Sequence, residues 1–276
     1  MLTHAFGSTG TAVPVIGQGT WQMNSEGLAA LRLGIELGMT HIDTAELYTG
    51  AEQVVADVLG PNRKKIFLVS KVVPSNASYK GTIRACEASL KRLRTDYLDV
   101  YLLHWWAGVY PIEDTMRAME ELAAAGKIRH IGVSNLDIPQ LRHAQKALSR
   151  EKIVCNQVLY HLRSRGIENR LIGYCESQNI AVVGYSPFGQ GNFPPPGSKQ
   201  GKALDTIATK HGKTPRQVAL NFLTRRKSLF AIPKSGDVDH VRENAGGAGW
   251  KLDQQDLKLI DDAFPAPGKD EPLDMI

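Results

Sequence analysis

Residues 66–71, with the sequence IFLVSK, place four consecutive apolar residues before a serine and a lysine. A short apolar run of this kind is typical of a strand that is buried on both faces, as in a parallel sheet. Comparable runs recur along the chain at intervals of about 30 residues, the length of one strand-and-helix unit, with a longer interval before the last run. The predicted strands are Val15–Gly17, His41–Asp43, Ile66–Lys71, Tyr97–His104, Arg129–Ser134, Val154–Gln157, Ala181–Tyr185 and Leu229–Pro233.

Segments with helical periodicity separate these strands. Eight alternating strands and helices predict closure into a (β/α)8 TIM barrel, a fold that uses about 250 residues in one domain. The chain has no linker rich in proline and serine, so we expect one domain over residues 1–276. The expected accessory parts are a hairpin in Met1–Thr11, a functional loop at Phe188–Lys199, an extra helix around Val218–Leu223 and an irregular tail over Phe264–Ile276.

The composition favours a globular protein of the cytoplasm. Hydrophobic residues make up 42% of the chain and charged residues 22%, which allows a sizeable core. No run of 18 apolar residues and no signal-peptide pattern occurs, so we expect neither membrane association nor export. The cysteines number three, without a CxxC pair, which argues for a reducing compartment and against a disulfide framework or a metal site.

The net charge of +5 is distributed over short basic clusters with acidic residues near each. Nucleic-acid binding would require basic residues gathered on one face with aromatic residues among them. We therefore expect no nucleic-acid partner, while attraction of a small anionic ligand stays open.

Polar residues end every predicted strand from the second onward, which is where a barrel of this kind carries its chemistry. Asp43 ends the second strand, Lys71 the third and His104 the fourth, and Tyr48 follows Asp43 by five residues. A lysine after a buried apolar run is unfavourable unless it is paired. The remaining strand ends carry Ser134, Asn135, Asn156, Gln157, Tyr185, Ser186, Lys234 and Ser235.

These residue types suit the reduction of a carbonyl group. We expect Asp43 to pair with Lys71, and the lysine to lower the pKa of the Tyr48 phenol so that it donates a proton near neutral pH. His104 would then orient a substrate oxygen. Nothing in the sequence suggests a redox metal or paired redox cysteines, so a bound hydride donor is implied.

Six motifs, taken together and in order, resemble those of the aldo-keto reductase superfamily over essentially the whole chain. The resemblance is closest to short bacterial members of the methylglyoxal reductase type, which end in a similar PLDMI tail (272–276). The motifs are IDTAELYTGAE (42–52), FLVSKV (67–72), DYLDVYLLHW (96–105), GKIRHIGVSN (126–135), NQVLYH (156–161) and AIPKS (231–235).

The resemblance implies a role for each matching residue. Tyr48 matches the general acid, Asp43 and Lys71 the pair that tunes it, and His104 the histidine that orients the substrate. Tyr185 matches the aromatic residue that stacks on nicotinamide. The cofactor site is completed by carboxamide contacts at Ser134, Asn135 and Gln157, 2′-phosphate contacts at Lys234 and Ser235, an adenine pair at Glu243 and Asn244, and further contacts at Thr20, Ser186 and His240. Trp21, Trp105 and Trp106 are expected in the substrate pocket, with ordinary packing as the alternative.

One departure from the family concerns the choice of cofactor. An arginine usually follows the IPKS lysine by six residues, whereas this chain has His240 there and Arg242 two positions later. A histidine cannot clamp a phosphate with two parallel hydrogen bonds as arginine does. We expect NADPH (NADP+), with NADH left open as a second cofactor. The expected partner is a small carbonyl compound such as methylglyoxal, a sugar aldehyde or a keto-sugar. The resemblance to the family also implies a monomer.

Two other functions stay open at this point. A nicotinamide-binding redox sensor or regulatory subunit would need the cofactor site but no acid, and the set Asp43, Tyr48, Lys71 and His104 speaks against it. A barrel isomerase or lyase would use Lys71 as a Schiff base, which pairing with Asp43 disfavours. Taken singly, Asp43 would be interpreted as a helix cap and His104 as a buried core histidine.

Overall fold

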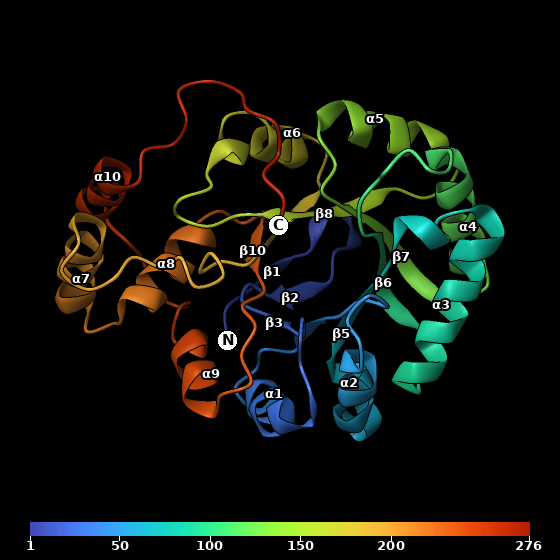
Figure 1. Ribbon diagram of the computed structural model, residues 1–276, viewed down its shortest axis with the longest axis horizontal. Helices are drawn as coiled ribbons and strands as arrows, with labels where there is room; N and C mark the ends of the chain where they lie inside the picture. Colours follow the sequence, from blue (N-terminus) through green and yellow to red (C-terminus); the bar gives the residue numbers. More distant parts are fainter.

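Eight parallel strands form a closed sheet at the centre of the molecule, and the computed structural model describes all 276 residues (Figure 1). Hydrogen bonds from Gly17 N to Ala231 O (2.8 Å) and from Ala231 N to Val15 O (2.9 Å) join the two ends of the sheet. The predicted (β/α)8 barrel is therefore confirmed. In sheet order the strands are β3 (Gln18–Gly19), β4 (His41–Asp43), β5 (Phe67–Val72), β6 (Leu98–Leu103), β7 (Ile128–Ser134), β8 (Ile153–Leu159), β9 (Ala181–Tyr185) and β10 (Leu229–Ala231).

The first strand lies later in the chain than Val15–Gly17, where it was expected. The ladder to β4 is made by Gln18 and Gly19, whereas residues 15–17 bond to the other neighbour, β10. The two contacts are staggered because the chain crosses the closure of the barrel obliquely. A Cβ at Gly19 would lie 2.8 Å from the carbonyl oxygen of Ile232, so this crossing requires glycine.

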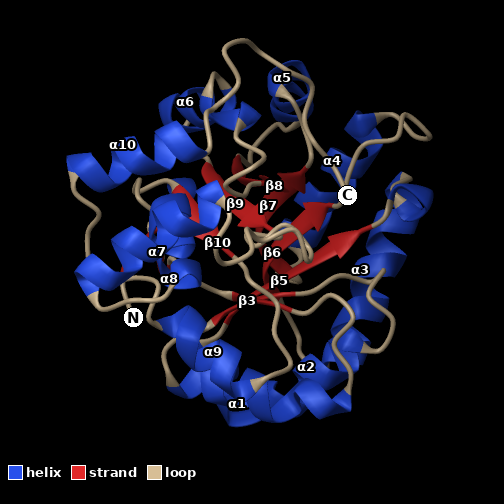
Figure 2. Cartoon of the chain, turned by 60° about the vertical axis from the view of Figure 1, so that its left-hand side comes forward, coloured by secondary structure: helices blue, strands red, loops and turns tan.

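Helices surround the strands on all sides (Figure 2). The unit between β9 and β10 contains two helices, which confirms the extra helix expected there. None of the helices combines the length and the hydropathy that a membrane crossing requires. The helices are α1 (Leu28–Glu36), α2 (Ala51–Leu59), α3 (Tyr79–Leu93), α4 (Ile112–Ala124), α5 (Ile138–Ala147), α6 (Leu171–Ser177), α7 (Lys199–His211), α8 (Pro215–Leu223), α9 (Val238–Ala245) and α10 (Gln254–Ala263).

The alternation of side chains along β5 places its lysine inside the barrel. Phe67 and Val69 belong to the apolar cluster of the barrel interior, whereas Leu68 and Val72 belong to the cluster between strands and helices. Successive side chains of a strand point to opposite faces, so Lys71 shares the inner face with Phe67 and Val69. The ammonium group of Lys71 therefore lies inside the barrel, at the carboxyl end of β5.

An N-terminal hairpin covers the amino end of the barrel. Strands β1 (Thr3–Ala5) and β2 (Ala12–Pro14) pair antiparallel, with Thr3 opposite Pro14, so the hairpin extends beyond the expected limit of Thr11. It lies across the middle of the ring of helices in Figure 1. Phe6 follows β1 and packs on Phe67 and Phe230, at ring-centroid distances of 4.8 and 4.9 Å.

His41 is fully buried beside these rings, and neither of its ring nitrogens has a hydrogen-bond partner. Burial, helped by the charge of Lys71, lowers its pKa from 6.5 to about 3. Below pH 6.5 the His41 imidazole therefore binds a proton in the unfolded chain but stays neutral in the folded protein. The free energy of unfolding falls as the pH falls from 6.5 toward 3.

We expect the free energy of unfolding to be about 2 kcal/mol lower at pH 5 than at pH 8 through His41 alone. Urea titrations of the parent and of His41→Leu at the two pH values measure this difference. The leucine variant should lose less stability on acidification than the parent. Equal losses in the two proteins would show that His41 is not the group responsible.

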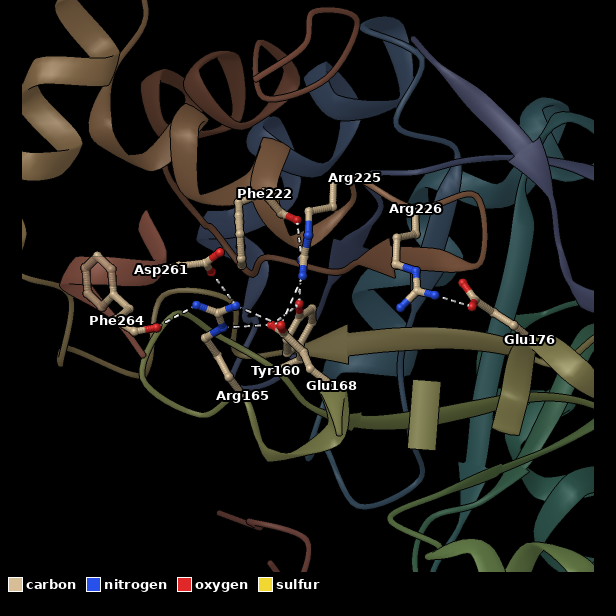
Figure 3. Close-up of polar contacts among 9 residues, drawn as sticks. All are labelled: Tyr160, Arg165, Glu168, Glu176, Phe222, Arg225, Arg226, Asp261 and Phe264. Carbon is tan, nitrogen blue, oxygen red and sulfur yellow. Dashed lines mark hydrogen bonds and ion pairs between the residues drawn. The ribbon is translucent and has the colours of Figure 1, made fainter. Parts of the chain in front are cut away.

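The C-terminal tail is irregular, as expected, and an ionic cluster around the buried Arg165 fixes its beginning (Figure 3). The Arg165 guanidinium donates to Phe264 O, to Asp261 (2.8 Å) and through two nitrogens to the Glu168 carboxylate (2.8 Å each). Glu168 also accepts hydrogen bonds from Tyr160 and Arg225. The loop after β8 is thereby tied to α10 and to the first residue of the tail.

Arg165→Met should lower the free energy of unfolding by about 2–3 kcal/mol, because the largely enclosed Glu168 carboxylate keeps only part of its donors. Arg170→Met is the matched control, since the pair of Arg170 with Asp270 lies at the surface and should contribute less than about 1 kcal/mol. Chemical denaturation of both variants measures the difference. Similar losses in the two would contradict the assignment of the cluster as the anchor of the tail.

Candidate active site

A cavity of about 670 Å³ opens at the carboxyl ends of the strands. Three of the four predicted catalytic residues line it, namely Asp43, Tyr48 and His104, and Lys71 lies behind them as the ion-pair partner of Asp43. The topology thus gathers residues from β4, β5 and the segments after β4 and β6 at one end of the barrel.

The expected ion pair between Asp43 and Lys71 is present and fully enclosed. Lys71 Nζ lies 2.5 Å from Asp43 Oδ1 and donates to Thr44 O at 2.9 Å. The second carboxylate oxygen of Asp43 accepts a hydrogen bond from Gln157 Nε2 at 2.7 Å. Burial alone would lower the pKa of Lys71, but Asp43 and Tyr48 outweigh it and raise that pKa. Lys71 is therefore a permanent cation, which is unsuited to forming a Schiff base.

Tyr48 lies next to this pair, with Lys71 Nζ 5.0 Å from the centroid of its ring. The expectation that its pKa is lowered is wrong: burial of the phenol raises the pKa, and the nearby ammonium only partly offsets this effect. The reason is that the same low-dielectric surroundings that strengthen the pull of Lys71 also disfavour a phenolate. Tyr48 therefore holds its proton at neutral pH, and Lys71 is placed to stabilise the anion that remains after the proton leaves.

His104 faces Tyr48 across the pocket, with ring centroids 5.8 Å apart in an edge-on arrangement. Burial and the charge of Lys71 lower its pKa to about 3, so the ring is neutral at physiological pH. Its Nδ1 is buried and has no hydrogen-bond partner in the protein. A neutral imidazole beside a phenol makes a hydrogen-bonding surface suited to an uncharged oxygen.

The residues assigned to the nicotinamide end are bonded to one another. Ser134 Oγ donates to Gln157 O (2.8 Å), Asn135 Nδ2 donates to Ser134 Oγ (3.1 Å), and the Tyr185 hydroxyl donates to Asn135 Oδ1 (3.0 Å). Thr20 lines the same cavity and donates from Oγ1 to Asp43 O at 2.9 Å. This network fixes their side chains before any ligand arrives.

Two of these positions have a left-handed backbone. Asn135 has a φ of 58° directly after β7, and Ser186 has a φ of 50° directly after β9. Residues other than glycine rarely adopt this conformation, and such positions concentrate at functional sites. Both residues line the cavity, so the strained positions coincide with the predicted site.

A second cavity, of about 620 Å³, continues the first. The two share Phe188, Gly191 and Lys234, so together they form one extended groove. The residues predicted at the adenosine end line the second cavity, namely Lys234, Ser235, His240, Glu243 and Asn244. The groove therefore runs from Tyr48 to α9 and presents polar side chains at both of its ends.

The predicted substrate-pocket tryptophans divide into two groups. Trp21 and Trp105 line the first cavity, Trp21 being 43% exposed. Trp106 does not line it: its Nε1 donates to Tyr110 O at 3.1 Å, and its ring packs edge-on against His143. Adjacent residues leave the strand end in different directions, which the sequence did not indicate.

Sequence reasoning missed several residues at the mouth of the cavity. Leu47 is 52% exposed there although it is apolar, and its place before Tyr48 in the motif was an available signal. Met275 and Ile276 also line the cavity, which brings the expected tail to the site. In the second cavity, Arg216 was missed because nothing in the sequence connects α8 with α9.

Comparisons with known proteins identify the family of the chain. The sequence model of the Aldo/keto reductase family matches residues 15–264. The chain is 45% identical over 273 residues to methylglyoxal reductase YeaE of Escherichia coli (strain K12), covering 96% of each protein, and 35% identical over 272 residues to glyoxal reductase of Bacillus subtilis (strain 168), covering 96% of this chain and 95% of that protein. A crystal structure of an aldo-keto reductase from Klebsiella pneumoniae in complex with NADPH matches with a TM-score of 0.93 and 39% identity, over 100% of both chains.

Proposed function

This chain belongs to the aldo/keto reductase family, and from that membership we propose that it reduces small aldehydes and ketones, methylglyoxal among them, with NADPH. The observation that carries the proposal is the group of Asp43, Lys71, Tyr48 and His104 at one end of the barrel. The chain is an oxidoreductase, like the methylglyoxal and glyoxal reductases that it resembles over nearly its whole length.

We propose that the groove binds a nicotinamide cofactor, with different residues holding its nicotinamide end and its adenosine end. Ser134, Asn135 and Gln157 would hold the carboxamide, and Tyr185 would stack on the ring. At the other end, Lys234 and Ser235 would hold the 2′-phosphate, and Glu243 and Asn244 the adenine. When bound, the reduced cofactor supplies the hydride that the side chains of this site do not provide.

Tyr48 is the proposed acid of the reaction. The carbonyl oxygen of the substrate would accept hydrogen bonds from the Tyr48 hydroxyl and the neutral His104 ring. As negative charge grows on that oxygen, the Tyr48 proton moves to it, and the phenolate that remains lies beside the Lys71 ammonium. Asp43 keeps Lys71 in position and protonated.

The substrate class follows from the mouth of the pocket. Trp21, Leu47, Trp105, Met275 and Ile276 surround it with apolar surface. Such a surface binds small carbonyl compounds without demanding a particular polar group. We propose a single catalytic domain that acts as a monomer in the cytoplasm; the three buried, unpaired cysteines agree with a reducing compartment.

The test is the oxidation of NADPH, followed by its absorbance, with methylglyoxal, glyoxal, a sugar aldehyde and a ketone. We expect turnover with at least the dicarbonyl compounds. Tight binding of NADPH without turnover of any of these substrates would instead favour the redox sensor or regulatory subunit. No binding of NADPH would contradict both functions.

A paired comparison of NADPH with NADH tests the choice of cofactor. Lys234→Ala should raise the KM for NADPH roughly tenfold or more and leave the KM for NADH nearly unchanged, because only NADPH carries the 2′-phosphate. His240→Arg adds a guanidinium to the same cavity, so a lower KM for NADPH would show that this chain lacks a replacement for the missing arginine. If His240→Arg had no effect, the missing arginine would be compensated elsewhere in this chain.

A further inference from the structure

The second cavity contains an arginine that the family motifs do not assign. Arg216 is the second residue of α8 and lines the cavity together with Lys234, Ser235 and His240. We propose that Arg216 supplies the guanidinium that binds the phosphomonoester at the adenosine end of the cofactor, in place of the arginine that His240 replaces. This inference rests on the proposed function of the groove.

The exposed guanidinium of Arg216 has neither a hydrogen-bond nor an ion-pair partner in the protein. Its Cζ lies 5.3 Å from the Phe193 ring centroid and 5.8 Å from that of Phe188, both on the loop after β9. Neither contact is a hydrogen bond, so the N–H groups of the guanidinium remain available to a ligand.

The backbone that carries Arg216 is fixed relative to the rest of the cavity. Thr214 and Gln217 close the first turn of α8 in a capping box. Gln217 Nε2 also donates to Glu243 O on α9 at 2.9 Å. The first turn of α8 is thus tied to α9, whose residues line the same cavity, so the backbone that carries Arg216 is fixed relative to them.

The other usual source of phosphate binding is already occupied. The N-terminus of a helix attracts a phosphate through its free N–H groups. At the start of α9, however, the N–H groups of Asp239 and His240 donate to the Asp237 carboxylate at 2.8 and 3.0 Å. The start of α9 therefore offers fewer free N–H groups to a phosphate, and side chains gain importance for binding it.

Two cations that line the cavity, Lys234 and Arg216, are not neutralised by contact with a carboxylate. Lys234 is exposed and, like Arg216, has no carboxylate partner. Asp205 and Glu243 also line the cavity, and neither forms an ion pair with these two cations. Arginine binds phosphate through two parallel hydrogen bonds, whereas the imidazole of His240 has no such fork. Lys234 and Arg216 together present the donors that a phosphomonoester requires.

The experiment compares 2′,5′-ADP with 5′-AMP, which lacks the 2′-phosphate, by calorimetric titration. Arg216→Gln should weaken binding of 2′,5′-ADP roughly tenfold to a hundredfold, the loss expected for charge-assisted hydrogen bonds, and change binding of 5′-AMP less than about twofold. Arg216→Lys should recover part of the loss. Lys202→Gln, which removes one positive charge from the exposed surface of α7, is the control and should change neither affinity.

The second arm adds His240→Arg to Arg216→Gln. This double variant should regain most of the affinity for 2′,5′-ADP, because the guanidinium returns to the same cavity from α9. Equal weakening of both nucleotides by Arg216→Gln, or no weakening, would overturn the inference while leaving the proposed function intact. A parent protein that neither prefers 2′,5′-ADP to 5′-AMP nor oxidises NADPH would overturn both.

Discussion

Tyr48→Phe is expected to lower kcat for carbonyl reduction by a factor of roughly 10² to 10⁴, the usual contribution of a general acid. The substitution removes only the hydroxyl, so the ring keeps its place beside His104 and Lys71. The affinity for the cofactor should change little, and the loss should appear in kcat. Steady-state kinetics with methylglyoxal and NADPH measure it.

Tyr174→Phe serves as the control, because it removes a phenol that has no hydrogen bond and lies on α6, outside the cavity. It should retain the parental rate. A Tyr48→Phe variant that turned over as fast as the parent would contradict the mechanism. The pH profile gives a second check. Because burial raises the pKa of Tyr48, the phenol keeps its proton, and the rate of reduction should not fall through loss of this proton between neutral pH and about pH 9.

Lys71→Met is expected to affect stability and catalysis together. The carboxylate of Asp43, 1% exposed, would lose its ammonium partner and keep only the hydrogen bond from Gln157. Removing one partner of a buried ion pair costs about 3–5 kcal/mol, so the free energy of unfolding should fall by about that amount. The turnover rate should fall as well, because the phenolate of Tyr48 would lose the neighbouring cation.

The double variant Lys71→Met/Asp43→Asn separates the two effects. Because both positions are neutral in the double variant, no unpaired charge is left buried. Most of the lost free energy of unfolding should therefore return. The turnover rate should stay low, since neither neutral residue stabilises a phenolate. Denaturant titrations and kinetics on the same three proteins test this, and recovery of the rate together with the stability would show that Lys71 has only a structural role.

The strands and the ends that carry the chemistry were predictable because their signals are local. A buried strand must be apolar over its whole length, so a lysine after Phe67, Leu68 and Val69 identifies both the strand and a group that needs a partner. The alternation of faces then directs Lys71 inward, where Asp43 arrives from the neighbouring strand. These inferences need only the chain, the period of a strand and the rule that parallel strands end together.

The predictions that were wrong concern properties that depend on contacts with several strands and helices at once. The direction of the Tyr48 pKa depends on how completely the barrel excludes water, and the sequence showed the cation but not the depth of burial. Trp106 and Trp105 are neighbours in the chain, yet only Trp105 reaches the cavity. The limits of the first strand were missed because closure sets its contacts with β10, a partner far away in the sequence.

The sequence by itself therefore determined the barrel and the family and predicted the catalytic group, since each rests on residue types at short, regular spacing. Only the tertiary structure decided the balance of charges around them. It showed that the Asp237 carboxylate accepts hydrogen bonds at the start of α9 and that Arg216 lines the cavity without an ion-pair partner. It also brought Met275 to the mouth of the site, with Arg165 tying the start of the tail to the barrel. Electrostatic and packing energies depend on distances between atoms, and the fold sets those distances among residues that are remote in the chain.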